Sequence, residues 1–446
     1  IEVALKNNVQ LEIAQKQIQL SKLKVLEAKR NLGPKLQFKY DEFGGRVPVA
    51  EGAGHYWGRK LSVEYKQPLY YGGELWYGLK QAEVNINIVE NDYQRIKNDV
   101  VLQVTKSYYG YDKSKKALDI QGQLLEEVSS LKDISQKGYE MGVIDNIEYL
   151  NVQSQQNQVN FQYISSEEDL ALAQLILQQA MNTEDPVDIY PIGEARILDI
   201  SLNTCYDLAY ANRPEMKLNY FMTEYYLYDK KIADAKSMPK VDLLGNWGHK
   251  VENYYKQDEP ANYLSHKFAP EWYAGIKVKV PMGGNEVGYT YTREVWQPTI
   301  SSFVHGSEAW SSAFTFDLLN QFPVWNEQNE ADVSFSRAQQ EYNKVKKEIT
   351  MEVKENYFKY RKAIVQLGVA QNKMEHQKKQ VEYTVLQNEL KEAPLSRLIE
   401  EMIKFSEEKF SMYQAIHDYF VAIESLNKAI GLLDYFDPHE KGALKG

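Results

Sequence analysis

The chain has 446 residues, with 52 Lys and Arg against 62 Asp and Glu, which gives a net charge of −10. This balance argues against a nucleic-acid-binding protein, because phosphate contacts need clustered basic charge. No run of about 18 apolar residues occurs, which excludes a transmembrane helix, and the single Cys205 excludes an internal disulfide framework or a CxxC site. The sequence begins at Ile1 without Met, as expected of a mature or truncated chain, so no targeting segment can be read.

Most of the chain has the apolar spacing of long helices. Ile86, Val89, Tyr93 and Ile96 recur at steps of three and four residues, separated by Asn, Asp and Gln. Similar spacing predicts helices over 7–31, 74–136, 145–181, 207–236, 325–391 and 395–431. Two of them exceed 60 residues, which is typical of long packed helices rather than of an ordinary globular domain.

Two windows rich in glycine and tryptophan interrupt the helices and have the period of strands. Leu36, Phe38 and Tyr40 alternate with polar residues, and so do the apolar residues from Trp272 to Val280. The spacing predicts strands at about 35–43 and 58–67, with others within 240–320. One apolar and one polar face over about ten residues is typical of a strand that faces lipid on one side and a lumen on the other.

The sequence contains an internal duplication. A shift of 205 residues aligns 3–41 with 208–246, so that Ala4 meets Ala209 and Pro34 meets Pro239, and a shift of 249 aligns Tyr108 with Tyr357. The duplication predicts two structural repeats, 1–206 and 207–446, each running helix, strand pair, very long helix, turn, helix.

With these features the sequence resembles the TolC-like outer-membrane efflux protein family. The resemblance rests on Ala-Leu-Lys-Asn-Asn at 4–8, Pro34-Lys35-Leu36, Pro68-Leu-Tyr-Tyr-Gly-Gly73, Gly142-Val-Ile and the duplication itself. It implies a mainly α protomer with a β-barrel portion, in which three copies form a 12-stranded outer-membrane β-barrel that continues into a long periplasmic α-helical barrel. It also implies that segments 183–206 and 432–446 lie at the equator of that helical barrel.

Two departures from the family leave questions open. Between Pro281 and Pro323 the chain carries extra strand-like runs, so either 271–296 is an added hairpin or each protomer supplies six strands to an 18-stranded barrel. The second helix turn, Lys391-Glu-Ala-Pro-Leu395, lacks the glycine of Gly142. Adaptor contact is therefore expected at Gly142, Val143 and Ile144 of the first turn rather than at the second.

Acidic residues near the helix turns are the candidate pore gate. Threefold symmetry would convert each of them into a ring of carboxylates, which favours cations and binds divalent ions. The resemblance places such rings just past the second turn, at Glu400 or Glu401, and Asp145 and Glu148 lie beside the first turn. The alternative is that these are solvated charges at helix ends, where Asp145 and Glu148 suit a helix N-terminus in any case.

The tryptophans are candidate membrane anchors, since Trp and Tyr concentrate at membrane–water boundaries. We expect Trp57, Trp247 and Trp272 to form such a belt, whereas ordinary packing at the junction of strands and helices suits Trp76 and Trp325.

No arrangement of residues indicates an enzyme, a cofactor site or a metal site, because the seven His are scattered and no phosphate-binding loop occurs. The resemblance implies a passive trimeric exit duct in the outer membrane of a Gram-negative bacterium, gated at the periplasmic helix turns. Its implied partners are two more copies of the chain, a periplasmic adaptor, an inner-membrane transporter of the RND, ABC or MFS class, and outer-membrane lipid. The competing hypothesis is a soluble elongated coiled-coil protein, structural or adaptor-like, with a small β cap domain.

Overall fold

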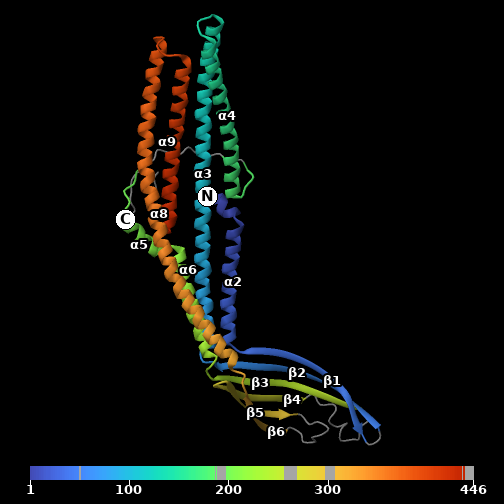
Figure 1. Ribbon diagram of the computed structural model, residues 1–446. Helices are drawn as coiled ribbons and strands as arrows, with labels where there is room; N and C mark the ends of the chain where they lie inside the picture. The colour runs from blue at the N-terminus through green and yellow to red at the C-terminus, as the bar shows by residue number, and fades with distance from the viewer. Residues whose placement is uncertain are drawn as a thin grey trace. The chain divides into compact units, whose positions relative to one another are not determined.

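The protein consists of long helices and one antiparallel sheet (Figure 1). The computed structural model describes residues 1–49, 52–185, 187, 197–255, 269–296, 307–433 and 435–436. Much of the two predicted equatorial segments, 183–206 and 432–446, lies outside the described residues. Among the described helices, none is both long and apolar enough to cross a membrane.

The chain folds as two compact units. One contains Ile1–Lys16, Glu90–Lys217 and Asn343–Gly446, and the other contains Gln17–Val89 and Leu218–Tyr342. Each predicted repeat contributes to both units, so the repeat boundary at 206 and 207 stays a prediction about internal homology.

Two helices are very long, as the sequence predicts. Helix α3 has 67 residues and α8 has 68. The helices span α1 Glu2–Asn7, α2 Val9–Leu32, α3 Glu74–Glu140, α4 Asn146–Met181, α5 Leu202–Asn212, α6 Pro214–Ala235, α8 Phe322–Glu389 and α9 Leu395–Ile430.

The expected single helix 207–236 is divided into α5 and α6, and the helix expected at 7–31 is α2, which the short helix α1 precedes. The breaks occur at Asn8 and Arg213, both with extended backbone angles, and the 205-residue shift aligns these two positions. Pro214 explains the second break, because a proline pushes the residue before it out of the helical region. Asn8 accepts a hydrogen bond from the backbone N–H of Leu11 at 3.1 Å and so caps the new helix α2.

In the first unit, buried apolar side chains join the helices of both predicted repeats. Leu124 and Val128 of α3, Val152 and Val159 of α4 and Ile399 of α9 form one cluster. A second cluster joins α1 and α2 to α3, and a third joins α8 to α9. In Figure 1, α3 lies along α4 and α8 lies along α9 as two hairpins. Burying an aliphatic side chain contributes roughly 1.5–3 kcal/mol, so these seams hold the hairpins together.

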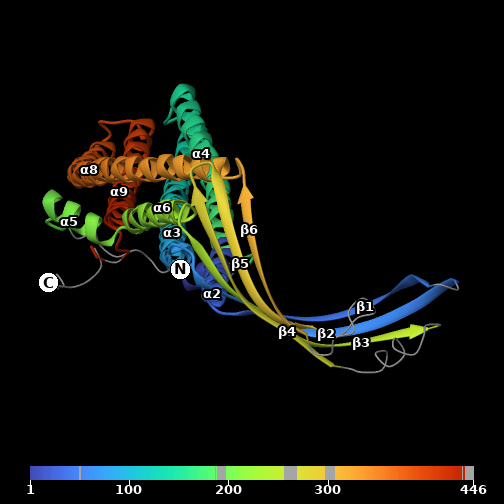
Figure 2. The ribbon, with the colours of Figure 1, turned by 90° about the horizontal axis from the view of Figure 1, so that it is seen from below.

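In the second unit, six strands form a single curved sheet in chain order (Figure 2). They span β1 Lys35–Val49, β2 Gly52–Tyr70, β3 Lys240–Tyr255, β4 Ala269–Met282, β5 Asn285–Trp296 and β6 Ser307–Asp317. The sequence left open whether the chain has four or six strands, and the described residues form six. The run 271–296 is a hairpin, β4–β5, and its register shows that it lies within the sheet, paired to β3 on one side and to β6 on the other.

The register gives the sheet two chemically different faces. Residues that pair directly across an antiparallel ladder lie on the same face, so the face can be followed from strand to strand. The apolar face carries Phe38, Val63, Trp247, Ile276, Tyr289 and Phe314, with at least one member on each strand. The charged face carries Lys39, Lys60, Asp242, Lys277, Glu286 and Asp317. The predicted alternation of the strands is therefore confirmed across the whole sheet.

Candidate functional site

The turn between α3 and α4 is closed by a glycine in the left-handed region. Gly142 has φ +71°, and its N–H donates to the carbonyl of Tyr139 at 2.9 Å. The N–H of Val143 donates to the carbonyl of Gly138 at 2.8 Å, which completes a Schellman cap. A Cβ at Gly138 would lie 2.7 Å from Ile144 Cδ1, so this glycine lets Ile144 pack against the end of α3.

The turn between α8 and α9 has the same cap without a glycine. Lys391 has φ +62°, its N–H donates to the Asn388 carbonyl at 2.9 Å, and the Glu392 N–H donates to the Gln387 carbonyl at 2.8 Å. The 249-residue shift places Lys391 on Gly142, so the missing glycine did not change the turn. A side chain in this region costs roughly 1–2 kcal/mol, which Lys391 bears and Gly142 avoids.

A hydrogen-bonded link joins the two turns. Helix α9 starts after Pro394, whose side chain cannot cap it. Instead the carboxylate of Glu148 in α4 accepts from the backbone N–H and from the hydroxyl of Ser396, each at 2.7 Å. An acidic side chain at a helix N-terminus is stabilising, because it satisfies N–H groups that have no partner inside the helix. We call this contact the Glu148–Ser396 link.

The other predicted gate acids have different surroundings. Asp145 caps α4 by accepting from the backbone N–H of Glu148 at 2.8 Å. The side chain of Glu401 is only 13% exposed and accepts from Gln377 Nε2 at 2.7 Å and from Lys404 Nζ at 3.1 Å. Partial burial opposes its ionisation, but these hydrogen bonds together with the positive charges of Lys404 and Arg397 outweigh burial and lower the pKa of Glu401. Glu400 is exposed and pairs with Lys404 at 2.8 Å.

Large apolar side chains are exposed at both turns. Met141 is 73% exposed, Val143 77%, Ile147 73% and Leu390 70%. Of the predicted adaptor contacts, Gly142 and Val143 are exposed, whereas Ile144 is half-buried against Gly138. The sequence analysis did not identify Met141, Ile147 and Leu390, because it searched for a glycine motif. It did not search for apolar side chains near the turns that the packing of the helices leaves exposed.

The predicted membrane-anchor tryptophans share one face of the sheet. Trp247 and Trp272 are direct partners on β3 and β4, and the next residues on that face toward the strand ends are His249 and Pro270. Trp57 lies farther along β2, where its Nε1 donates to Glu42 at 2.9 Å and Arg59 lies 4.3 Å from the ring centroid. Trp310 on β6, which the sequence analysis did not select, is on the same face and 69% exposed.

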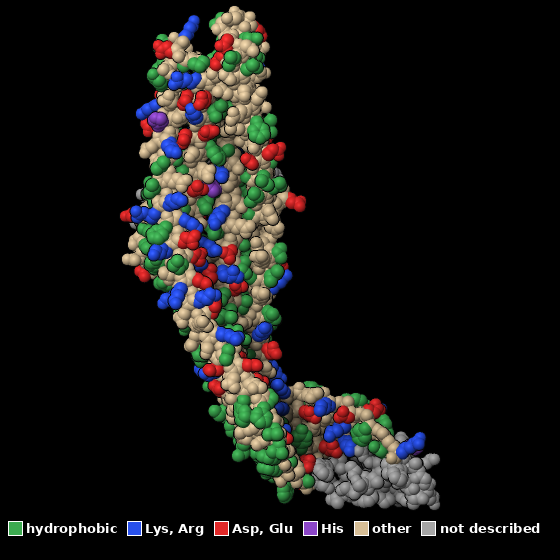
Figure 3. Space-filling view, viewed as in Figure 1, with side chains coloured by type: hydrophobic (Ala, Val, Ile, Leu, Met, Phe, Trp, Pro, Cys, Tyr) green, Lys and Arg blue, Asp and Glu red, His purple; other side chains and the backbone are tan. Residues whose placement is uncertain are grey.

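The junction of strands and helices is also apolar on its surface. Trp76 is 53% exposed and Trp325 is 43% exposed, and both lie in the first turns of long helices. Leu318, Leu319 and Phe322 are exposed beside Trp325, and Figure 3 shows hydrophobic side chains gathered at that end of α8. Farther along α8, Lys, Arg, Asp and Glu are interspersed on the face in view.

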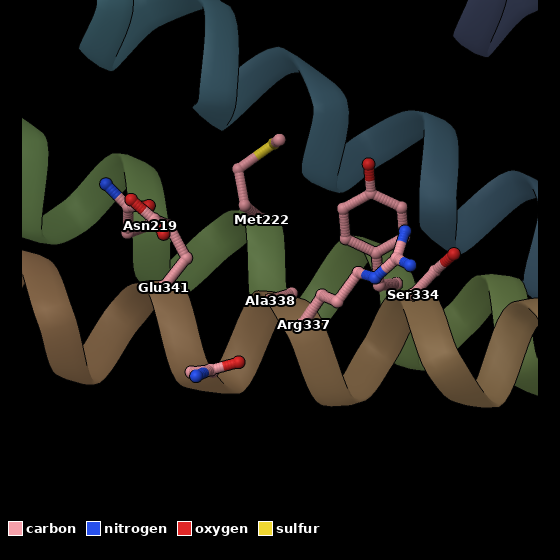
Figure 4. A pocket seen from close by; sticks show the side chains of 8 residues that line it. Asn219, Met222, Ser334, Arg337, Ala338 and Glu341 are labelled. Atoms are coloured by element: carbon pink, nitrogen blue, oxygen red, sulfur yellow. The ribbon is translucent and has the colours of Figure 1, made fainter.

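A cavity of about 450 Å³ lies between α6 and α8 within the second unit. Figure 4 shows Asn219 and Met222 on α6 and Ser334, Arg337 and Glu341 on α8. Its lining mixes one basic and one acidic group with amide and apolar side chains, which does not define a reaction. Among the described residues, no group of three or more His, Cys, Asp or Glu could hold a metal ion.

Comparison with known proteins finds a family model that matches part of the chain and solved structures with a similar fold. The family model for outer membrane efflux protein matches residues 1–183. No curated protein matches the chain. The CmeC outer membrane channel of Campylobacter jejuni is 14% identical, with a TM-score of 0.76 over 98% of this chain and 86% of that one. The VceC outer membrane protein of Vibrio cholerae is 12% identical, with a TM-score of 0.74 over 96% and 94%. At these identities the likeness of the structures concerns the fold alone.

Proposed function

We propose that this chain is a TolC-like outer membrane efflux protein and acts as a passive exit duct. The family model over residues 1–183 and the likeness in fold to outer-membrane channels support this proposal. The duct lies in the outer membrane of a Gram-negative bacterium and extends into the periplasm. Three copies form it, and it opens at the turns between α3 and α4 and between α8 and α9. It serves a tripartite efflux pump or a type I secretion system, and it performs no chemistry of its own.

The two-faced sheet carries this proposal. On β4 the apolar face runs without a charge from Trp272 to Val280, which is about 27 Å of strand at roughly 3.4 Å per residue. On β2, β5 and β6 the apolar run of the same face ends at a charged residue, which is Arg59, Arg293 and Glu308 respectively. An apolar band about 25 Å tall, bordered by aromatic residues and backed by a polar face, is the pattern of an outer-membrane strand.

Helices α4 and α8 each have a second apolar seam that supports assembly of several copies. In α8, Ile349, Val353 and Tyr360 are buried, but Met351, Phe358 and Val365 are exposed and recur every seven residues. In α4, the exposed members are Ile147, Phe161, Leu172 and Leu175, while Val152, Val159 and Leu177 are buried. A helix that is apolar on two sides needs a second neighbour, which another copy of the chain supplies.

The helix turns are the proposed gate and adaptor site. The Glu148–Ser396 link ties the first hairpin to the second, so opening the duct requires this contact to break or move with both hairpins. Glu400, which is exposed near the start of α9, is the proposed ring carboxylate. Met141, Val143 and Leu390 supply apolar contacts for the helical tips of a periplasmic adaptor, which in turn connects the duct to an inner-membrane RND, ABC or MFS transporter.

The experiment that tests the function is extraction followed by conductance. We expect the protein to stay in outer-membrane vesicles through carbonate and high-salt washes, to leave them only in detergent, and to form discrete channels in a planar bilayer. The competing soluble coiled-coil scaffold predicts release by carbonate or salt and no conductance. That result would overturn the duct.

A further inference from the structure

The β4–β5 hairpin has no counterpart in the first repeat. Strand β1 follows helix α2 and Pro34, and β3 follows helix α6 and Pro239. Strand β2 leads into α3, and β6 leads into α8. The duplication therefore matches β1 with β3 and β2 with β6, and places the hairpin between the last two as an addition.

The added hairpin is built into the wall of the sheet. It turns through Gly283 and Gly284, with φ +59° at Gly283, as in a two-residue type II′ hairpin. Its strands continue both faces without a break, with Ile276 on the apolar face and Lys277 on the charged one. Glu271 of β4 pairs with Lys60 of β2 at 3.2 Å across the intervening strand.

Two glycines mark places where neighbouring strands come close together. A Cβ at Gly248 would lie 2.6 Å from the carbonyl oxygen of Leu61, and one at Gly275 would lie 2.5 Å from that of Tyr291. Both glycines belong to the charged face, and at each of them the neighbouring strand leaves no room for a Cβ. Glycines at such close approaches allow a sheet to bend, and Gly275 places one within the added hairpin, as a barrel wall requires.

Among the described residues, the edge strands β1 and β6 have no further partner strand, and both carry an exposed aromatic side chain. Phe38 of β1 is 77% exposed and Phe314 of β6 is 70% exposed, and both lie on the apolar face. With six strands in alternating direction, β1 and β6 run antiparallel, so β6 of one copy can extend the ladder onto β1 of the next. Hydrocarbon does not tolerate an open edge, because its N–H and C=O groups would have no partners.

We propose that each copy contributes all six strands to one closed barrel, so that three copies form an 18-stranded wall instead of the 12 strands expected from the family. This inference rests on the proposed trimeric duct. With strands about 4.8 Å apart and tilted about 40°, the backbone diameter is about 36 Å, against about 24 Å for 12 strands. The barrel is then a wide aqueous outlet, and selection by size lies at the helix turns.

Cysteine pairs that share one position on β6 test the strand order. In a Cys205→Ala background, Phe314→Cys is combined in turn with Tyr289→Cys on β5, with Trp247→Cys on β3, and with Leu36→Cys, Phe38→Cys or Tyr40→Cys on β1. Each variant is oxidised in outer-membrane vesicles and analysed by denaturing electrophoresis and peptide mass spectrometry. Tyr289 and Phe314 are direct partners, so their pair is the positive control.

We expect a disulfide within one chain for the pair with β5, disulfides between chains that build covalent trimers for at least one β1 position, and none for Trp247→Cys. A β3–β6 disulfide would overturn the inference, because it requires the hairpin to lie outside the wall. Trimers that give no β1–β6 disulfide at any of the three positions would overturn it as well. If chemical crosslinking of the native protein gave no trimer at all, the proposed function itself would fail.

Discussion

In the second helix turn, Lys391 adopts a left-handed backbone conformation that is unfavourable for a residue with a side chain. Its left-handed backbone is imposed by the cap hydrogen bonds to Gln387 and Asn388, which reproduce the cap around Gly142. The same cap thus forms at both turns, and the residue at its left-handed position determines only the energetic cost of that backbone conformation.

Replacing Lys391 with Gly should stabilise this turn. Removing the Cβ relieves roughly 1–2 kcal/mol of left-handed strain, and the added freedom of the unfolded chain takes back about 0.4–1 kcal/mol. We expect amide hydrogen exchange of residues 386–393 to slow by roughly twofold to fivefold. Gly142→Ala is the matched control at the equivalent position and should accelerate exchange of 138–144. Equal rates for Lys391→Gly and the parent would show that the strain is absent.

At the scale of elements, the Glu148–Ser396 link explains why α9 needs no cap from its own turn. The carboxylate belongs to α4, and both of its hydrogen bonds go to the first turn of α9. The two helical hairpins are therefore joined by an electrostatic contact in addition to the apolar cluster around Val152 and Ile399.

Glu148→Ala should loosen the start of α9. Loss of a helix cap costs about 0.5–2 kcal/mol, so exchange of the first-turn amides of α9 should accelerate severalfold. If the link helps to close the duct, single-channel recordings should also show a higher open probability. Glu392→Ala is the control, since it removes an exposed carboxylate near the same turn. Unchanged recordings with accelerated exchange would make the link structural only.

At the scale of the whole molecule, the exposed apolar helix faces indicate that one chain does not bury all of its apolar surface by itself. Helix α8 has one apolar side buried within the chain and another, at Met351, Phe358 and Val365, that is exposed. The sheet has two open edges as well. In the proposed trimer, neighbouring copies supply the partner that each of these features lacks within one chain.

Phe358→Glu should weaken that assembly. A charge placed in an apolar seam cannot be paired there and costs several kcal/mol when buried, so we expect loss of trimers on native electrophoresis at micromolar concentration. Gln366→Glu adds the same charge at an exposed polar site of the same helix and should leave trimers intact. A trimer that survives Phe358→Glu would exclude this seam from the interface.

The sequence by itself determined the local structure of this protein. Periodicity set the long helices and the two faces of the strands, because these preferences act between residues a few positions apart. The break before Pro214 is also local in origin, although we expected one helix over 207–236. The tertiary structure alone decided that the β4–β5 hairpin lies within the sheet and that Glu148 caps α9. The partners in that cap are 248 positions apart in the chain. Such contacts depend on how distant segments pack together. The sequence around a strand edge or a carboxylate does not specify which distant group it will pair with.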